Sequence, residues 1–250
     1  VMRDWSPLAV AAWAGELGLI PQLIDGGADA AAADDTGVPP VFRAAGAGHV
    51  EAVELLLAAG ADPGRRADGR NLLHLLARTG PPRLVAQLAT DAALRNQRDA
   101  DGATPLLVAA AGGSPAVVET LLGAGADAGT SAGDGLGPLH AAAQRGETAI
   151  LTLLIDGGAP LNARDASGRT ALWWAARKAH PAAVGLLLER GAAPVAASDG
   201  TTPLHVAAAA DDPAVLRALV DAGVPLDAVT STGSTALLVA ADRGRVDAVR

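Results

Sequence analysis

The 250-residue sequence contains no cysteine and no tyrosine, and it has a single phenylalanine and a single methionine. Without cysteine the chain can form neither a disulfide bond nor a thiolate metal site. Aromatic residues make up only 2% of the chain although 50% of it is hydrophobic, because the apolar content is mainly Ala, Leu and Val. No apolar run approaches the roughly 18 residues that a membrane-spanning helix needs, so we expect no membrane insertion.

Targeting signals and lysine are also scarce. The opening residues, Val1 to Trp5, show no signal-peptide pattern, which together with the lack of cysteine favours a cytoplasmic location. Only one of the 19 basic residues is lysine, and the formal net charge is −8. Because the arginine excess accompanies abundant Ala and Gly, it is typical of a GC-rich genome. The acidic balance and the lack of a nucleic-acid motif disfavour a nucleic acid partner.

One glycine recurs along the chain at intervals of 32 or 33 residues. The copies are Gly37, Gly69, Gly102, Gly135, Gly168, Gly200 and Gly233. A fixed period in this range indicates a stack of small similar units rather than one closed globule. Each unit in such a stack contacts only its neighbours, so the chain has a long surface on which another macromolecule can bind.

A short block follows each glycine and defines the unit. Its clearest copies are Thr104-Pro105-Leu106, Gly137-Pro138-Leu139-His140, Thr170-Ala171-Leu172, Thr202-Pro203-Leu204-His205 and Thr235-Ala236-Leu237. Weaker copies begin at Ser6, Pro39 and Asn71. An alanine pair follows in most copies, as at Ala109-Ala110, and then a second apolar cluster and a Gly-Ala-Asp stop, as at Gly125-Ala126-Asp127.

This arrangement resembles the ankyrin repeat, and the resemblance covers nearly the whole chain in eight copies. It implies an all-α fold: an ankyrin-repeat solenoid of stacked helix-turn-helix units with projecting hairpin loops. We expect a single array over residues 1–250. The approximate repeats are 4–36, 37–68, 69–101, 102–134, 135–167, 168–199, 200–232 and the incomplete 233–250.

The chemistry of one unit agrees with that fold. Thr can cap the exposed N–H groups at a helix start, and Pro suits the first helical position. Alanine pairs make a slim first helix. The second helix has apolar residues at helical spacing, such as Val53, Leu56 and Leu57, and Gly60 can end it with a left-handed conformation. One unit cannot bury this apolar stripe alone, so stacking must build the core.

Repeat three departs from the pattern. Asn71-Leu72 replaces Thr-Pro, Pro81-Pro82 marks the start of its second helix, and residues 89–96 replace the Gly-Ala-Asp stop. Proline is tolerated there only at a helix start. Two interpretations remain open: a degenerate repeat that still stacks, or a local bend or recognition site.

The two ends lack the polar capping repeats that such arrays usually need. Repeat one begins directly at Ser6-Pro7-Leu8, and repeat eight stops inside its second helix, just after Val249. We therefore expect the chain to be a fragment of a longer protein.

No residue pattern predicts catalysis, a metal site or a cofactor. Three of the five histidines, His74, His140 and His205, occupy the same slot of the repeat block, where ankyrin folds typically use histidine for hydrogen bonds between repeats. The other two, His49 and His180, lie at the start of a second helix. Repeated slots lie one repeat apart and do not provide the converging ligands that a metal needs. No nucleophile, base and acid combine in a catalytic pattern.

The tryptophans and the basic residues suggest a binding surface. Trp13 follows the Ala11-Ala12 pair, on the helix side that faces the concave groove of ankyrin folds, and Trp173 and Trp174 are either inter-repeat packing or an anchor in that groove. Groove-side positions and loop tips are rich in arginine, whereas acidic residues concentrate on the second helices. This segregation would attract an acidic partner; ordinary solvated charge is the alternative.

The sequence therefore predicts a non-catalytic protein–protein interaction module that binds a partner protein or peptide, preferentially acidic, through the concave groove and loop tips. The candidate contacts are Trp13, Arg43, Arg65, Arg66, Arg78, Arg145, Trp174, Arg177 and Lys178. The alternative is a non-catalytic repeat region of a larger enzyme, effector or scaffold whose activity lies outside this chain.

Overall fold

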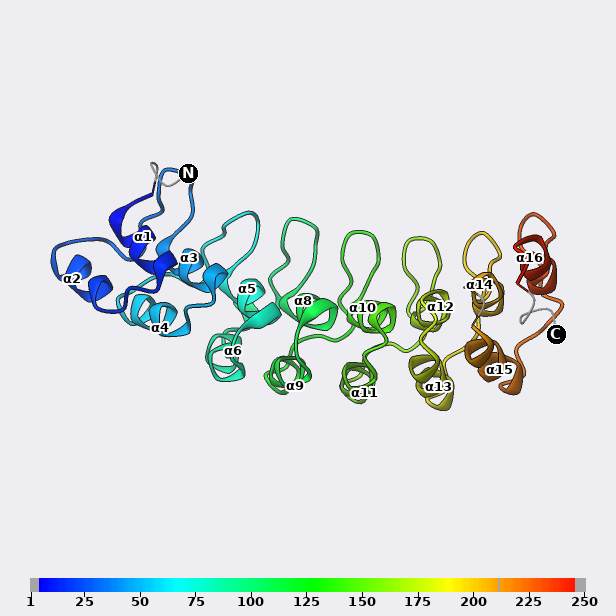
Figure 1. The fold of residues 1–250 in the computed structure, drawn as a ribbon. Helices are drawn as coiled ribbons and strands as arrows, with labels where there is room; N and C mark the ends of the chain where they lie inside the picture. Colours follow the sequence, from blue (N-terminus) through cyan, green and yellow to red (C-terminus); the bar gives the residue numbers. More distant parts are fainter. Residues whose placement is uncertain (1–4, 211, 246–250) are drawn as a thin grey trace. The chain divides into compact units, whose positions relative to one another are not determined.

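The computed structural model describes residues 5–210 and 212–245, apart from the side chain of Thr79. Throughout these residues every regular element is an α-helix, and most of the helices form antiparallel pairs (Figure 1). The chain divides into two compact units, Val1–Ala126 and Asp127–Arg250. No helix of the described residues is both long enough and apolar enough to cross a bilayer.

Unit 1 contains a row of first helices and a row of second helices. Its first helices are α1 (Pro7–Ala14), α3 (Pro40–Ala47), α5 (Leu72–Thr79) and α8 (Pro105–Gly112). Its second helices are α2 (Leu19–Asp25), α4 (Val50–Ala58), α6 (Pro82–Ala89) and α9 (Pro115–Gly123), and a short additional helix is α7 (Ala92–Asn96). The first helices pack consecutively, α1 on α3, α3 on α5 and α5 on α8.

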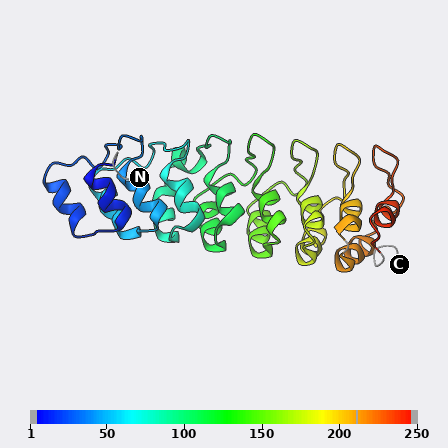
Figure 2. The same cartoon turned by 45° about the horizontal axis from the view of Figure 1, so that its top comes forward.

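Unit 2 repeats this arrangement. Its first helices are α10 (Pro138–Arg145), α12 (Ala171–Arg177), α14 (Pro203–Ala210) and α16 (Ala236–Asp242). Its second helices are α11 (Thr148–Asp156), α13 (Pro181–Glu189) and α15 (Pro213–Asp221). In each unit a hairpin loop rises beside the first helices that follow α1, on the side away from the second helices (Figures 1 and 2).

The helix boundaries follow the capping residues of the repeat. Thr104 begins α8 by accepting the N–H of Leu107 at 3.3 Å, and Pro105 occupies the first helical position. Gly60 and Gly125 follow the second helices with φ of 94° and 89°, the left-handed region that glycine reaches without steric cost. The predicted start and stop signals are therefore confirmed.

The core of each unit lies between the two rows of helices. Alanine pairs such as Ala109 and Ala110 are fully buried, so neighbouring first helices approach closely. On α4, Val53 and Leu56 are fully buried while Leu57 is only half-buried. The apolar stripe of the second helix is thus narrower than the sequence pattern alone suggests.

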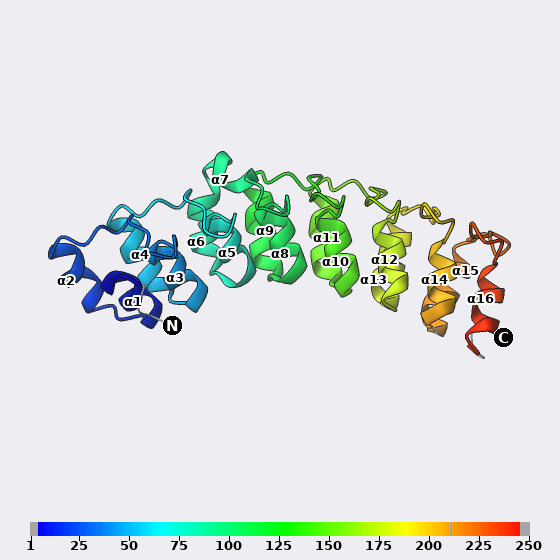
Figure 3. The same ribbon diagram turned by 90° about the horizontal axis from the view of Figure 1, so that it is seen from above.

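Repeat three stacks on its neighbours despite its irregular sequence. Its second helix α6 begins at Pro82, as expected, and α7 replaces the Gly-Ala-Asp stop beyond the C-terminal end of α6 (Figure 3). Asn71 donates its side-chain amide to the Leu94 carbonyl at 2.9 Å, and Arg95 donates to the Ala89 carbonyl at 2.6 Å. These bonds fix α7 against the repeat.

The hairpins of unit 2 are bonded to one another near their tips. The backbone N–H of each hairpin donates across 2.9 Å to a carbonyl of the preceding hairpin: Ala166 to Asp134, Ser198 to Ser167 and Ser231 to Asp199. The repeat glycine permits this approach. At Gly168 φ is +75°, and a Cβ atom there would lie 2.9 Å from the backbone nitrogen of Ser198. That the repeats form one array over residues 1–250 stays a prediction.

Candidate functional site

A hollow of about 260 Å³ opens on unit 1 between its first helices and the hairpins that precede α3 and α5. Trp13 on α1 and Leu75 on α5 line it from the two helices that flank α3, and Phe42 contributes from α3 itself. The Trp13 side chain is 43% exposed, whereas Phe42 is buried. We call this feature the Trp13 hollow.

The hollow exists because one helix position alternates in size. This position is Trp13 on α1 and Gly46 on α3, each directly after an alanine pair, and Arg78 after Leu76-Ala77 on α5. A Cβ atom at Gly46 would meet no heavy atom within 4 Å. The middle position is therefore open space, and the indole of Trp13 on the neighbouring helix α1 lines the same hollow.

The indoles beside the hollow are fixed by an aromatic and cationic cluster. Trp5 and Trp13 meet edge to face, with ring centroids 6.0 Å apart and an interplanar angle of 72°. The Arg43 guanidinium carbon lies 3.9 Å from the Trp5 ring centroid, a cation–π geometry. One face of Trp5 is thus covered by Arg43.

Arg43 is also bonded to a buried carboxylate. Its Nε and Nη2 atoms donate to Asp34 Oδ2 at 3.1 and 2.9 Å, and Asp34 Oδ1 accepts the N–H groups of Thr36 and Val38 at 3.0 and 3.2 Å. Burial would raise the pKa of the Asp34 carboxyl, but these hydrogen bonds lower it below its usual value. The predicted contact Arg43 is therefore charge-compensated within the chain.

The same carboxylate recurs three residues before other repeat glycines. Asp99 Oδ1 accepts hydrogen bonds from the N–H groups of Asp101 and Ala103 at 3.0 and 2.8 Å. Its Oδ2 accepts a hydrogen bond from Arg70 Nε at 3.3 Å. In all three copies, Asp34, Asp99 and Asp165, one oxygen closes the hairpin turn and the other accepts a side-chain donor. The hairpin carboxylates are thus structural elements shared by both units.

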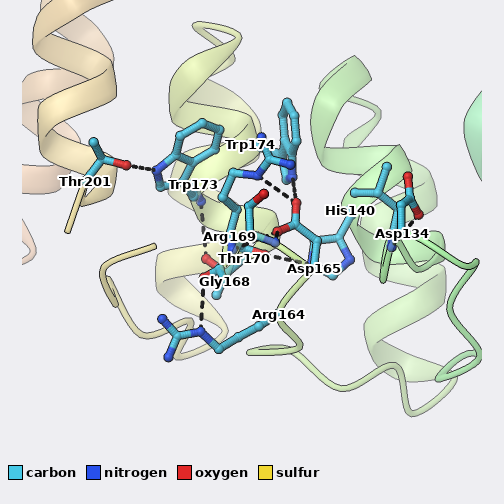
Figure 4. Close-up of polar contacts among 12 residues, drawn as sticks. Asp134, His140, Arg164, Asp165, Gly168, Arg169, Thr170, Trp173, Trp174 and Thr201 are labelled. Atoms are coloured by element: carbon cyan, nitrogen blue, oxygen red, sulfur yellow. Dashed lines mark hydrogen bonds and ion pairs between the residues drawn. The ribbon is translucent and has the colours of Figure 1, made fainter. Parts of the chain in front are cut away.

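In unit 2 the Asp165 carboxylate organises the tryptophan pair (Figure 4). Its Oδ2 accepts Arg169 Nε at 2.8 Å and Trp174 Nε1 at 3.0 Å. Trp173 and Trp174 pack edge to face with centroids 5.2 Å apart, and Trp173 donates to Thr201 Oγ1 at 3.2 Å. Burial would raise the pKa of the Asp165 carboxyl. The hydrogen bonds from Arg169, from Trp174 and from the backbone of the turn outweigh this effect and lower the pKa below its usual value. Trp173 is buried against the next repeat, and Trp174 is half-buried.

Two predicted loop contacts, Arg65 and Arg66, connect hairpins of unit 1. Arg65 donates to the Ala31 carbonyl at 2.8 Å. Arg66 donates to the Gly69 carbonyl at 3.0 Å and also to the Arg98 carbonyl. Both side chains are exposed, but their bonds are to neighbouring backbone, so they stiffen the loop row as well as presenting charge.

The other predicted cations lie at the C-terminal ends of first helices. Arg78 on α5, Arg145 on α10, and Arg177 and Lys178 at the end of α12 are all exposed. The Arg145 Nη2 atom lies 3.9 Å from Glu147 Oε1, a long ion pair. The other three side chains make no ion pair with the residues that the structure describes. Their charges remain available, and the negative end of the helix dipole favours cations there.

The acidic residues of the second helices are partly neutralised. Glu54 pairs with Arg83 at 2.7 Å, and Asp156 pairs with Arg190 at 2.7 Å. Such exposed pairs contribute little stability, typically 0–1 kcal/mol each. They reduce the anionic character that the sequence pattern suggested for this side of the repeats.

The histidines make structural contacts. His74 Nε2 lies 3.0 Å from the Ala103 carbonyl oxygen of the next repeat, and His205 Nε2 lies 2.9 Å from the Ser234 carbonyl oxygen of the next repeat. His140 Nε2 lies 3.0 Å from the Ala163 carbonyl oxygen of its own repeat and 3.2 Å from the Arg169 carbonyl oxygen of the next. Gly137 donates its N–H to His140 Nδ1 at 3.1 Å, which assigns the ring proton to Nε2. Among the described residues no group of three or more His, Asp or Glu side chains is arranged to hold a metal ion.

Sequence reasoning missed several residues of the Trp13 hollow. Gly46, Phe42 and Leu75 were not selected, because each looks like an ordinary helix residue in the sequence. Asp34 and Asp165 carry a usable signal, since each precedes a repeat glycine by three positions. The structure brings Trp13 and Arg43 together in unit 1.

Comparisons with known proteins agree with this architecture. A family model described as ankyrin repeats (3 copies) matches residues 106–198 and 193–250, which together make up more than half of the chain, and a model described as ankyrin repeat matches residues 36–67. A segment of 67 residues is 46% identical to the 2-5A-dependent ribonuclease of Mus musculus, covering 26% of this chain and 9% of that protein. The chain thus spans a small part of this relative's length. The predicted all-α ankyrin-repeat fold is confirmed, and the chain belongs to the ankyrin-repeat family, whose repeats generally serve as non-catalytic protein-interaction modules.

Proposed function

We propose that this chain is a non-catalytic interaction module that binds a segment of a partner protein on its first-helix and hairpin surface. The observation that carries the proposal is the exposed indole of Trp13 beside an open hollow. Tryptophan is enriched at the energetic centres of protein interfaces. The helices and hairpins are already ordered by repeat packing, so little conformational entropy is lost on this side when a partner binds.

The partner is acidic. Arg78 in unit 1 and Arg145, Arg177 and Lys178 in unit 2 present exposed positive charge at the ends of first helices. Segregated charge of this kind accelerates association with an oppositely charged segment and suppresses partners of like charge.

The remaining predicted contacts have a supporting role. Arg43 and Trp174 are oriented by Asp34 and Asp165, so they offer fixed surfaces rather than mobile side chains. Arg65 and Arg66 offer charge at the loop row. Fixed side chains lose little rotamer entropy on binding, which favours their use as contacts.

A second possibility is that the repeats form the non-catalytic region of a larger enzyme, effector or scaffold. This possibility is supported by the similarity to a segment of a ribonuclease, because the matching segment makes up only 9% of that protein. In that case the same surface would bind a regulatory partner or another part of the same protein.

Affinity capture from a lysate of the source cells tests the proposal. The wild-type chain is compared with a variant carrying Trp13→Ala, Arg78→Glu and Arg177→Glu. The matched control carries Val220→Ala and Arg217→Glu, which change an exposed apolar residue and an exposed arginine of α15, a second helix outside the proposed surface.

We expect a protein that is retained by the wild type and by the control but is lost from the first variant, with unchanged circular dichroism for all three. Equal capture by all three chains would place the interface elsewhere. If no protein is captured, the interaction-module proposal fails for the chain by itself.

A further inference from the structure

We propose that the Trp13 hollow receives one bulky apolar side chain, aromatic or leucine, from a partner peptide whose flanking residues are acidic. Gly46 is the position that determines this specificity. The inference rests on the proposed function and deepens it by naming the chemistry of the partner.

The first argument is space. Gly46 lies within α3, its φ is not positive, and nothing lies within 4 Å of the place where its Cβ would be. No constraint of the fold therefore requires glycine there. The corresponding positions on the flanking helices are occupied by Trp13 and Arg78, so the gap is local and has room for a side chain from outside.

The second argument is the apolar lining. Trp13 is 43% exposed, and Val38, Phe42 and Leu75 also line the hollow. An apolar side chain that enters here would cover these groups, and aromatic side chains bury roughly 150–250 Å² each. Fully covering such an anchor dominates the affinity of many interfaces.

The third argument is charge. Arg43 and Arg70 line the hollow, and their carboxylate partners Asp34 and Asp99 are buried, with side-chain exposures of 0% and 2%. A ligand at the surface therefore meets the guanidinium side of two ion pairs that are each neutral overall. Arg78 adds an exposed cation without an ion pair among the described residues.

The hollow also contains one anionic group, Asp68, which is exposed. An acidic residue of the peptide placed beside Asp68 would be repelled, whereas one placed near Arg78 would be attracted. An acidic residue of the peptide is therefore favoured toward the C-terminal end of α5, where Arg78 lies, and disfavoured at the hairpin that contains Asp68.

The test is selection of peptides from a randomised displayed library on the full chain. The selected peptides are then synthesised and titrated, with tryptophan fluorescence as the signal. Gly46→Leu fills the hollow. Gly185→Leu is the matched control, because Gly185 lies within helix α13 of unit 2 and its Cβ position is equally open.

We expect the selected peptides to share a bulky apolar residue with acidic neighbours. Gly46→Leu should weaken their binding at least about tenfold, while Gly185→Leu should bind like the wild type. Replacing the apolar anchor of the peptide by alanine should give a similar loss. Melting temperatures no lower than that of the wild type for both variants show that the fold is intact.

Three results would overturn the inference. Peptides that bind Gly46→Leu as tightly as the wild type but lose affinity with Arg177→Glu would leave the proposed function standing and place binding outside the hollow. No enriched peptide at all would count against both proposals. An equal loss of affinity with Gly185→Leu and with Gly46→Leu would show that the effect does not arise at the hollow.

Discussion

Trp174 donates its indole N–H to Asp165 across 3.0 Å, and the two residues lie nine positions apart. In unit 1 Arg43 donates in the same way to Asp34, which lies nine positions before it in the sequence. A guanidinium and an indole thus occupy equivalent helix positions and use the same carboxylate oxygen. Because the other oxygen closes the hairpin turn, the aspartate connects the hairpin to its first helix.

Removing that carboxylate should destabilise the protein. Asp165→Ala leaves the donors of Trp174 and of the turn backbone without their acceptor, and we expect a loss of about 2–3 kcal/mol in the free energy of unfolding. Urea unfolding followed by tryptophan fluorescence measures it. Asp227→Ala, which changes an exposed aspartate, should have little effect. Equal midpoints for the two variants would refute the connecting role.

The hairpin carboxylates also predict acid sensitivity. The pKa values of Asp34, Asp99 and Asp165 are all lowered in the folded state, so the unfolded chain binds protons more readily. Their stabilisation is present above the unfolded pKa of about 3.9 and is lost as the pH falls through the lower folded values. As the pH is lowered below about 4, the urea concentration at the unfolding midpoint should therefore decrease. The decrease should be less steep in Asp165→Ala than in the wild type. A parallel decrease in both chains would contradict the prediction.

The buried histidines predict a second dependence at higher pH. Burial lowers the pKa of His74 and of His140, so the neutral rings stabilise the fold above the unfolded pKa of about 6.5. Below that value the unfolded state takes up protons first, and stability decreases. The urea concentration at the unfolding midpoint should decrease as the pH is lowered from 7.5 to 5.5. His140→Gln should reduce this slope, and an unchanged slope would show that His140 does not contribute.

Glycines with positive φ should differ in how much their substitution lowers the free energy of unfolding. Gly168 and Gly158 both have positive φ, but a Cβ at Gly168 would lie 2.7 Å from Ser198 Oγ, whereas one at Gly158 meets nothing within 4 Å. Gly158→Ala should cost about 1 kcal/mol from backbone strain, and Gly168→Ala more. Gly102 has a φ of 82°, so Gly102→Val should likewise lower the free energy of unfolding by more than about 1 kcal/mol. Thermal unfolding of the three variants gives the order, and equal losses for Gly158 and Gly168 would be inconsistent with the close hairpin approach.

Gly46 should behave in the opposite way. Replacing a helical glycine that has open space around it by alanine improves helix propensity by up to about 1 kcal/mol. We therefore expect Gly46→Ala to raise the melting temperature slightly. A lower melting temperature would mean that the fold itself requires glycine at this position.

The sequence was sufficient to predict the family, the helix pairs and their caps, since these depend on residues adjacent in the chain. Thr104 and Pro105 begin α8 where expected, and all seven repeat glycines from Gly37 to Gly233 have positive φ. The additional helix α7 was not predicted, because residues 89–96 lack the repeat signals and their conformation depends on bonds from Asn71 and Arg95.

The candidate site was less predictable. Charge patterns marked Arg43 and Arg78 alike, but the structure shows Arg43 bonded to Asp34 while Arg78 is exposed. Which arginine keeps a free charge depends on side-chain geometry across a hairpin and a helix. The importance of Gly46 was also hidden, since a hollow is defined by neighbours on other helices and not by the residue itself.

The backbone bonds between successive hairpin tips of unit 2 involve no side-chain atoms. Side chains at the exposed tips can therefore be exchanged without disturbing the spacing of the loops, provided that the repeat glycines remain. Natural variation or laboratory selection could thus alter what this surface recognises, one loop at a time, while the scaffold beneath it stays the same.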